Sequence, residues 1–130
     1  MLDSPSMDEL QRLLASCAER ADAGRAALVG RDGLVVESMS VTESATAIFD
    51  LPLLAAEATD LLAVADRVTG AALDAGTCDE VACRSANAAV VLRRLADGSF
   101  VLLLMPADGD AENGRTVLAE LAPEFETVLA

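Results

Sequence analysis

The sequence predicts an α/β protein of the α+β sandwich type, in which helices cover both faces of a five-stranded antiparallel sheet in the order α-β-β-α-β-β-β-α. Two Asp-Gly pairs, at 32–33 and 97–98, lie between apolar runs, which is a strong β-hairpin signal. The run at 100–105, FVLLLM, is apolar throughout, which indicates a strand covered on both faces. Residues 51–76 hold the longest helical period of the chain.

The chain opens with an amphipathic helix and a hairpin. Apolar side chains recur along the helix at helical spacing: Leu10, Leu13, Leu14, Cys17 and Ala18. Two apolar runs then flank Asp32-Gly33, and we expect a type I′ turn there, which needs a positive φ at both central residues. The alternative is a loop that merely contains the Asp-Gly pair.

The helix at 51–76 organises the rest of the chain. Pro52 suits its first turn and Gly76 suits its end. Its predicted core face is a stripe at helical spacing: Leu54, Ala58, Leu61, Leu62, Ala65, Val68 and Ala72.

The far side of this helix carries small residues. Ala56, Ala63 and Gly70 recur every seven residues, where a solvated face more often has Lys or Glu. A row of small residues lets another helix come close, so we expect the sheet to bury one side and a partner the other. The alternative is an exposed alanine-rich face in an alanine-rich protein.

Three strands and a helix complete the predicted fold. Residues 79–85 alternate between two faces, as in a half-exposed edge strand. Strands at 88–95 and 100–105 follow, joined by a tight turn. The last helix begins near residue 111, and we expect Pro123 to kink or divide it. Its predicted inward side chains are Val117, Leu118, Leu121, Phe125 and Val128.

Length and composition set limits on function. The 130 residues are expected to form a single domain, 1–130, with a core of Leu, Val and Ala, because 53% of residues are hydrophobic but only 2% aromatic. All nine basic residues are Arg, which with the high Ala content suggests a bacterial source. The net charge of −13 argues against nucleic acid and anionic membranes as partners, and it suits a basic protein partner.

The sequence predicts a cytoplasmic protein with reduced cysteines. It opens without a signal-peptide pattern, and its longest apolar run is too short to be inserted across a membrane. Cys78 and Cys83 lie in one extended segment, roughly 17 Å apart at strand rise, which is too far for a bridge. Cys17 falls on the apolar side of the first helix.

No catalytic, cofactor-binding or metal-ligating residues are predicted, so we expect no enzyme activity and no cofactor. The chain has no histidine, and its glycines fit no phosphate-binding spacing. Residues 108–112 lack the ligand order of a calcium loop, so their carboxylates are better explained as helix-start residues. Arg93 and Arg94 suggest an arginine finger, but neighbouring strand residues face opposite ways, so at most one could serve.

These elements resemble a roadblock / dynein light-chain domain. The resemblance rests on the opening helix, the hairpin AALVGRDGLVVES, the long Ala/Leu helix and the meander EVACRSANAAVVLRRLADGSFVLLLM, and it covers about residues 7–129. Its most distinctive piece is RDGLVV, in which Gly33 matches the family's turn glycine.

The resemblance implies a homodimer, or a heterodimer with a paralogue, in which the second helices pack together and the third strands pair into one sheet. It also implies a small Ras-like GTPase as partner; similar bacterial members include Mgl-type activators of cell-polarity GTPases. The predicted dimer interface comprises Ala56, Thr59, Asp60, Ala63, Asp66, Arg67, Gly70, Val81 and Cys83. Glu57 and Asp60 are the predicted contacts to a basic partner.

Two functions from different classes follow. The first is a non-enzymatic regulator or binding partner of a small GTPase in bacterial signalling or polarity, including GTPase activation. The alternative is a scaffold subunit of a signalling or motor complex with no effect on nucleotide turnover. A small-molecule sensor ranks third, because no set of polar residues converges in the predicted elements.

Overall fold

The computed structural model describes residues 5–41 and 50–130, with side chains from residue 7 onward. Its elements are α1 (Pro5–Ala21), β1 (Arg25–Val29), β2 (Val35–Ser40), α2 (Leu51–Asp66), the π-helix η1 (Arg67–Ala72), β3 (Glu80–Arg84), β4 (Ala88–Arg94), β5 (Phe100–Pro106) and α3 (Ala111–Leu129). All neighbouring strands are antiparallel, in the order β2-β1-β5-β4-β3. The predicted fold class is confirmed.

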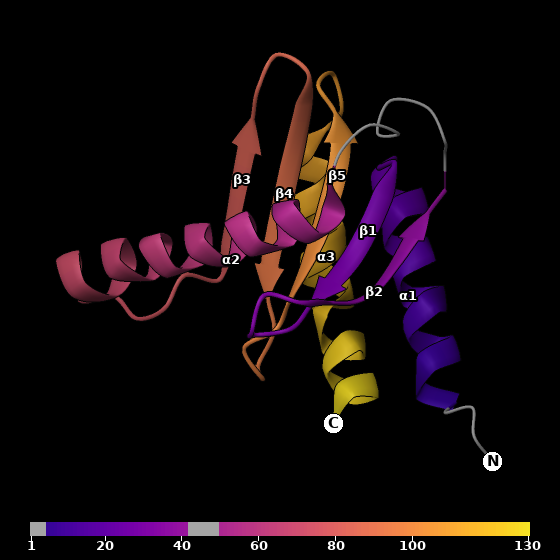
Figure 1. Cartoon of the computed structure of the whole chain (residues 1–130), viewed down its shortest axis with the longest axis horizontal. Helices are drawn as coiled ribbons and strands as arrows, with labels where there is room; N and C mark the ends of the chain where they lie inside the picture. The colour runs from indigo at the N-terminus through magenta and orange to yellow at the C-terminus, as the bar shows by residue number, and fades with distance from the viewer. Residues whose placement is uncertain (1–4, 42–49) are drawn as a thin grey trace.

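The central strand β5 separates two hydrophobic cores. Val101, Leu103 and Met105 pack with α1 and α3 on one face, whereas Phe100 and the alternate residues after it pack with α2 on the other. Figure 1 shows α1 and α3 behind the sheet and α2 crossing its front. The prediction that both faces of this strand are covered is therefore confirmed.

The predicted hairpin at Asp32-Gly33 forms, but the predicted type I′ turn is wrong. Gly33 has a φ of +88°, while Asp32 is not among the described residues with positive φ. The Gly33 N–H donates to the Gly30 carbonyl (2.9 Å), so the loop is a type I turn closed by a left-handed glycine. The Asp32 carboxylate accepts the Leu34 N–H (3.1 Å). This local side-chain bond stabilises a turn in which Asp32 itself does not have a positive φ.

The core face predicted for α2 is correct only in its first half. Ala58 and Leu62 are buried, but Val68 is 52% exposed and Ala72 is also exposed, which corrects both assignments. The 16 residues of α2 and the 6 of η1 extend roughly 30 Å. Five strands span only roughly 20 Å between their outer members. The helix therefore leaves the sheet and projects beyond β3 (Figure 1).

Helix α3 is capped as expected and continues through Pro123. Asp110 accepts the Asn113 N–H (3.0 Å), in agreement with a helix-start role for the acidic residues there. Pro123 lies inside an unbroken helix, so the predicted division does not occur. The predicted inward residues are buried, with Val128 partly so. Within the described ranges, no helix is long and apolar enough to cross a membrane.

Candidate interaction surface

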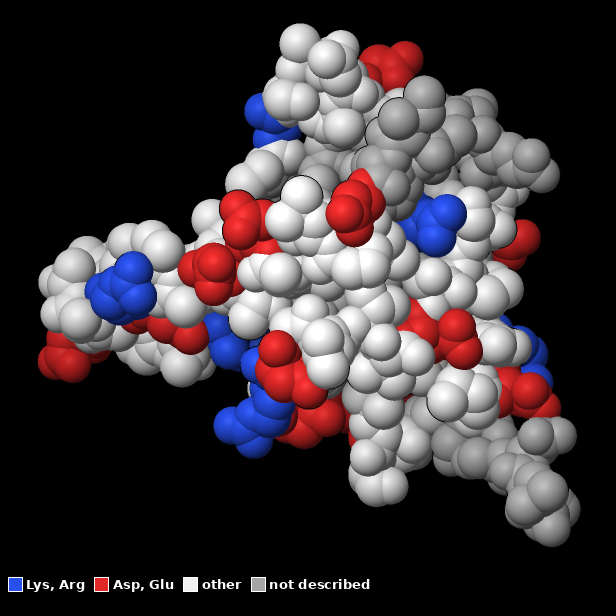
Figure 2. All heavy atoms as spheres, in the orientation of Figure 1, with Lys and Arg blue, Asp and Glu red and all other residues white. Residues whose placement is uncertain are grey.

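The outward face of α2 is apolar for an exposed helix. Opposite the buried Ala58 and Leu62 lie Leu53, which is 58% exposed, and Val64, which is 46% exposed. Figure 2 shows this side as mostly uncharged, with separate acidic groups along α2 and a basic group toward its projecting end. Such a face is typical of a surface that another protein covers.

The predicted small-residue stripe is partly on this face. Ala56 and Ala63 are exposed, as are Glu57 and Asp60 between them. Gly70, the third member, is half-buried in η1, where a Cβ would lie 3.4 Å from the Gly76 carbonyl oxygen. Its small size therefore already serves a contact within the chain, whereas Ala56 and Ala63 leave room for something outside it.

Two of the predicted interface residues direct their polar groups into their own chain. The Thr59 hydroxyl donates to the Ala55 carbonyl (2.8 Å), and its side chain lies over the Gly33 turn. The Asp66 carboxylate accepts the Cys78 N–H and an Arg94 N–H, both at 2.8 Å. Among the predicted charged residues, Asp60 and Arg67 are exposed.

Asp66, Arg94 and Cys78 form a clamp at the point where α2 becomes η1. Arg94 also donates from Nε to the Cys78 carbonyl (3.0 Å), so the two side chains hold both backbone groups of Cys78. The clamp fixes the segment 67–79, here called the arm, against β4. Sequence reasoning missed it because Asp66 and Arg94 are 28 positions apart.

The two outer strands differ in how their edges are occupied. On β2, the Ser38 N–H points away from β1, and the Glu37 carboxylate accepts it (3.0 Å). On β3, Ala82 lies at mid-strand and is exposed, with backbone groups that point away from β4. Side chains cap an edge group on both strands, Glu37 on β2 and the Cys78 thiol at the Glu80 carbonyl of β3 (3.1 Å), but Ala82 at the middle of β3 is exposed, so β3 is the more open edge.

The predicted interface residues of β3 lie on its α2 face. Val81 packs against the α2 core, and Cys83, two residues on, is exposed on that same face. The strand is therefore half-exposed and at the sheet edge, as predicted.

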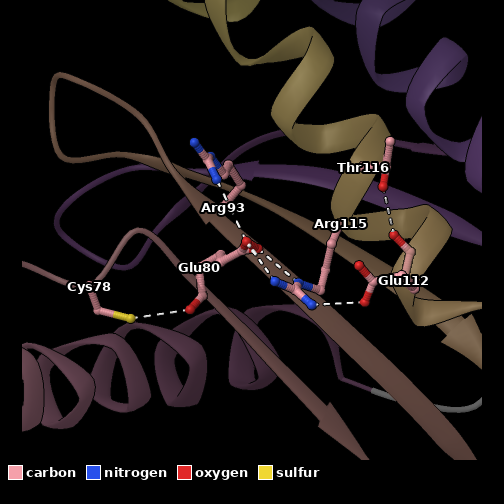
Figure 3. Close-up of polar contacts among 6 residues, drawn as sticks. All are labelled: Cys78, Glu80, Arg93, Glu112, Arg115 and Thr116. Carbon is pink, nitrogen blue, oxygen red and sulfur yellow. Dashed lines mark hydrogen bonds and ion pairs between the residues drawn. The ribbon is translucent and has the colours of Figure 1, made fainter.

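The other face of β3 carries an ion-pair network. Glu80 accepts Arg115 Nε (2.9 Å) and Nη2 (3.2 Å) from α3, and Arg93 Nη1 lies 3.8 Å away. Figure 3 shows these groups pointing toward one another, with Glu112 beside Arg115. The hydrogen bonds from Arg115 hold the pKa of Glu80 below its ordinary value, with help from the charges of Arg115 and Arg93. Arg93 and Arg94 do face opposite sides, as predicted, and each lies beside a carboxylate.

No protein-family model and no curated protein matches the sequence. Solved structures do match. An MglB structure with a tetrameric arrangement has a TM-score of 0.87 at 12% identity, covering 98% of this chain and 93% of that chain. A Roadblock/LC7 domain from Streptomyces avermitilis has a TM-score of 0.77 at 18% identity, covering 92% of this chain and 96% of that chain. MglC from Myxococcus xanthus has a TM-score of 0.62 at 29% identity, with 91% and 97% covered.

This chain has the roadblock/LC7 fold. The resemblance inferred from the hairpin and the meander is thus confirmed at the level of structure, at identities that establish fold alone.

The cysteines of this roadblock/LC7 fold are all free, as predicted. Cys17 is fully buried under α3, and burial raises its pKa to about 12. The Cys78 thiol donates to the Glu80 carbonyl (3.1 Å). Within the described residues, no group of three or more acidic, cysteine or histidine side chains could hold a metal ion.

A polar cleft lies between α2 and the two Asp-Gly turns, and sequence reasoning did not find it. It encloses about 220 Å³ and is lined by residues that include Arg31, Thr59, Ala63, Asp66 and Arg94. Phe100 and Leu62 also line it. Because Arg94 is already paired with Asp66, the cleft offers a ligand little free charge beyond Arg31.

Proposed function

We propose that this chain is a non-enzymatic, dimeric regulator that binds a small Ras-like GTPase. The observation that carries the proposal is the exposed apolar face of α2, a helix that crosses the sheet and projects past the open β3 edge. Exposed hydrophobic side chains on one helix and an unpaired strand next to it are the two features that a partner can cover together.

The concentration of exposed apolar side chains supports a dimer. Of the seven large hydrophobic side chains that are exposed among the described residues, four lie between positions 53 and 73: Leu53, Val64, Val68 and Leu73. A two-fold contact brings the same surface of both copies together, so one apolar helix face can serve both. The partner in this contact is a second copy or a paralogue with the same helix.

The acidic groups on the same helix support a basic partner. Glu57 and Asp60 are exposed beside the small residues of α2, in a chain with a net charge of −13. The resemblance to Mgl-type activators of small GTPases, together with the structural likeness to MglB and MglC, favours a GTPase as this basic partner. Arg93 and Arg94 lie beside Glu80 and Asp66, so we expect the protein to act by reshaping the GTPase and not by donating an arginine.

A scaffold role is the second candidate. One MglB structure of this fold has a tetrameric arrangement, which shows that the fold can support assemblies larger than a dimer. A scaffold would bind its partner without changing nucleotide turnover.

The test uses a purified bacterial small Ras-like GTPase, loaded with GTP or with GDP. We expect the purified protein to bind it, and to change the single-turnover rate of GTP hydrolysis if it is a regulator. Replacing Glu57 and Asp60 by Arg should lower the association rate, because charges at the rim of an interface mainly steer encounter. The matched control replaces Asp108 and Glu124, which are exposed elsewhere, by Arg.

The outcomes separate the candidates. Binding with altered hydrolysis supports the regulator, and binding with unchanged hydrolysis supports the scaffold. Association kinetics that are equal for both double variants would remove α2 as the docking surface. If the wild-type protein does not bind the GTPase in either the GTP or the GDP state, the proposed partner class is wrong.

A further inference from the structure

The cleft between α2 and the two Asp-Gly turns is lined by parts of the chain that are distant in sequence. Arg31 comes from the first turn, Gly98 from the second and Arg94 from the end of β4, while α2 supplies a further wall. Figure 1 shows both turns on the same side of α2, and Figure 2 shows basic groups gathered there beside acidic ones. The fold thus brings two guanidinium groups to one small cleft, in a chain with a net charge of −13.

The guanidinium group of Arg31 has its full bonding capacity left. Among the described residues, Arg31 makes no hydrogen bond and no ion pair. The nearby carboxylate of Asp97 accepts the backbone N–H and the hydroxyl of Ser99 instead. These bonds lower the pKa of Asp97, and the charge of Arg31 adds only a smaller effect. All five N–H groups of Arg31 therefore remain for a ligand.

Gly98 sets the position of the Arg31 side chain. A Cβ at Gly98 would lie 3.5 Å from the Arg31 Cβ and 3.4 Å from its Nε, so the arginine side chain packs directly on the glycine. Gly98 also has a φ of +93°, which other residues rarely adopt. Because this glycine lines the cleft, the guanidinium group beside it is held at the cleft wall.

Arg94 adds hydrogen-bond donors to the cleft but no net charge. It donates to Asp66 (2.8 Å) and to the Cys78 carbonyl (3.0 Å), which leaves three of its five N–H groups. Because Asp66 balances the charge of Arg94, the free positive charge is that of Arg31 alone. One charge suits a carboxylate, whose planar group matches a guanidinium in two parallel bonds. A phosphate group carries about −1.5 to −2 at pH 7 and fits this balance less well.

The size and the apolar lining of the cleft limit the rest of the ligand. The volume of about 220 Å³ corresponds to roughly seven water molecules at about 30 Å³ each. Pockets for drug-sized ligands begin at about 300 Å³, so a nucleotide is too large. Leu62, Ala63 and Phe100 add apolar surface to the lining. These limits fit a carboxylate with a short aliphatic chain.

We propose that this cleft binds a short aliphatic carboxylate, with the carboxylate group on Arg31 and the chain against Leu62 and Phe100. The proposal goes beyond the regulation of a GTPase and does not depend on it. A ligand in this position lies beside the Asp66–Arg94 pair, so it contacts the clamp that fixes the arm.

Titration with butyrate, followed by two-dimensional amide NMR spectra, tests the proposal. We expect saturable shifts in the millimolar range, as befits a ligand of few atoms, concentrated at the amides of Gly33, Thr59 and Gly98. Butyramide has the same shape without the charge, and we expect it to bind at least roughly tenfold more weakly. Inorganic phosphate should also bind more weakly than butyrate. Equal affinity for butyrate and either of these probes would overturn the carboxylate assignment.

Substitution of Arg31 tests the residue that carries the proposal. We expect Arg31→Gln to weaken butyrate binding at least roughly tenfold, because a charge-assisted pair is lost. The fold should not change, since Arg31 is exposed and bonds to no described group. Arg67→Gln is the matched control, because it removes the same charge from an exposed position that does not line the cleft. Equal affinity of the two variants would mean that butyrate responds to overall charge, and the proposal would be wrong.

A free acid and an acidic side chain of a protein partner present the same carboxylate group. Glutamic acid with an acetylated amino group and an amidated α-carboxyl group serves as the probe for such a side chain. Tighter binding of butyrate supports a free acid as the ligand, whereas tighter binding of the blocked glutamate supports a partner's side chain. If neither probe gives saturable shifts at the cleft amides, the cleft is not a carboxylate site.

Discussion

Glu80 connects the edge strand β3 to helix α3 through a single carboxylate. Its side chain is 27% exposed, and it accepts hydrogen bonds from Arg115 at 2.9 and 3.2 Å. Because the pKa of Glu80 is lowered in the folded state, the native protein holds the proton less strongly than the unfolded chain does. The carboxylate thus stabilises the fold above its ordinary pKa of 4.5, and this contribution is lost as the pH falls through the lower folded value.

We predict that Glu80→Gln lowers the melting temperature at pH 7 and that its difference from the wild type shrinks on acidification below about pH 4.5. The reason is that protonation removes from the wild type the interaction that the variant lacks throughout. Melting curves between pH 3 and 7 measure this. Glu124→Gln, at an exposed position on α3, is the control and should show a small difference at all pH values. A Glu80→Gln deficit independent of pH would contradict the ion-pair explanation.

At the scale of elements, the clamp decides how the arm is held. The arm extends past the sheet with exposed Val68 and Leu73, so it has little core of its own. Its attachment to the rest of the chain is through the bonds of Asp66 to Cys78 and Arg94, whereas the Thr69 hydroxyl donates to the Gly76 carbonyl (2.7 Å) within the arm. Segments with few buried contacts open locally without global unfolding.

Replacing Asp66 by Ala should loosen the arm more than the sheet. We expect faster amide exchange across residues 67–79 and unchanged protection in β5. The free energy of unfolding should fall by about 1–2 kcal/mol, because a pair of charge-assisted hydrogen bonds at a partly exposed site is removed. Hydrogen–deuterium exchange by mass spectrometry measures this. Asp60→Ala, six residues earlier on the same helix and exposed, serves as the control. Uniform exchange changes in both variants would mean that Asp66 has no particular role in the arm.

Local signals in the sequence were sufficient for most elements but not for their limits. Period-two alternation and the Asp-Gly pairs predicted the strands and hairpins, because each depends on residues a few positions apart. The exposure of Val68 depends instead on where the sheet ends beneath the helix. The Asp66–Arg94 contact likewise depends on tertiary packing, because the two residues lie 28 positions apart. The turn at Asp32 is not the predicted type I′ turn. The hydrogen bond from the Leu34 N–H to the Asp32 carboxylate favours a different turn, and an Asp-Gly pair alone does not reveal that bond.

At the scale of the whole molecule, the structure changes what a dimer built on α2 would bring together. If two copies of α2 pack antiparallel about an axis at Ala63, Ala56 faces Gly70, and Asp60 faces Asp66 of the second copy. Asp66 is already paired with Arg94, so Asp60 would meet an ion pair and not a bare carboxylate. The same arrangement brings the exposed Leu53 toward Leu73 of the second copy, at the two ends of the contact.

We therefore predict that Ala63→Arg abolishes the dimer. The exposed Ala63 would lie against its own copy at the axis, and two guanidinium groups there would be desolvated without partners, which costs several kcal/mol. Ala119→Arg places the same side chain on an exposed position of α3, away from α2, and should leave the dimer unchanged. Light scattering after gel filtration gives the mass of each variant. A dimer of Ala63→Arg at micromolar concentration would mean that the small residues of α2 lie outside the interface, and that the β3 edge alone joins the copies.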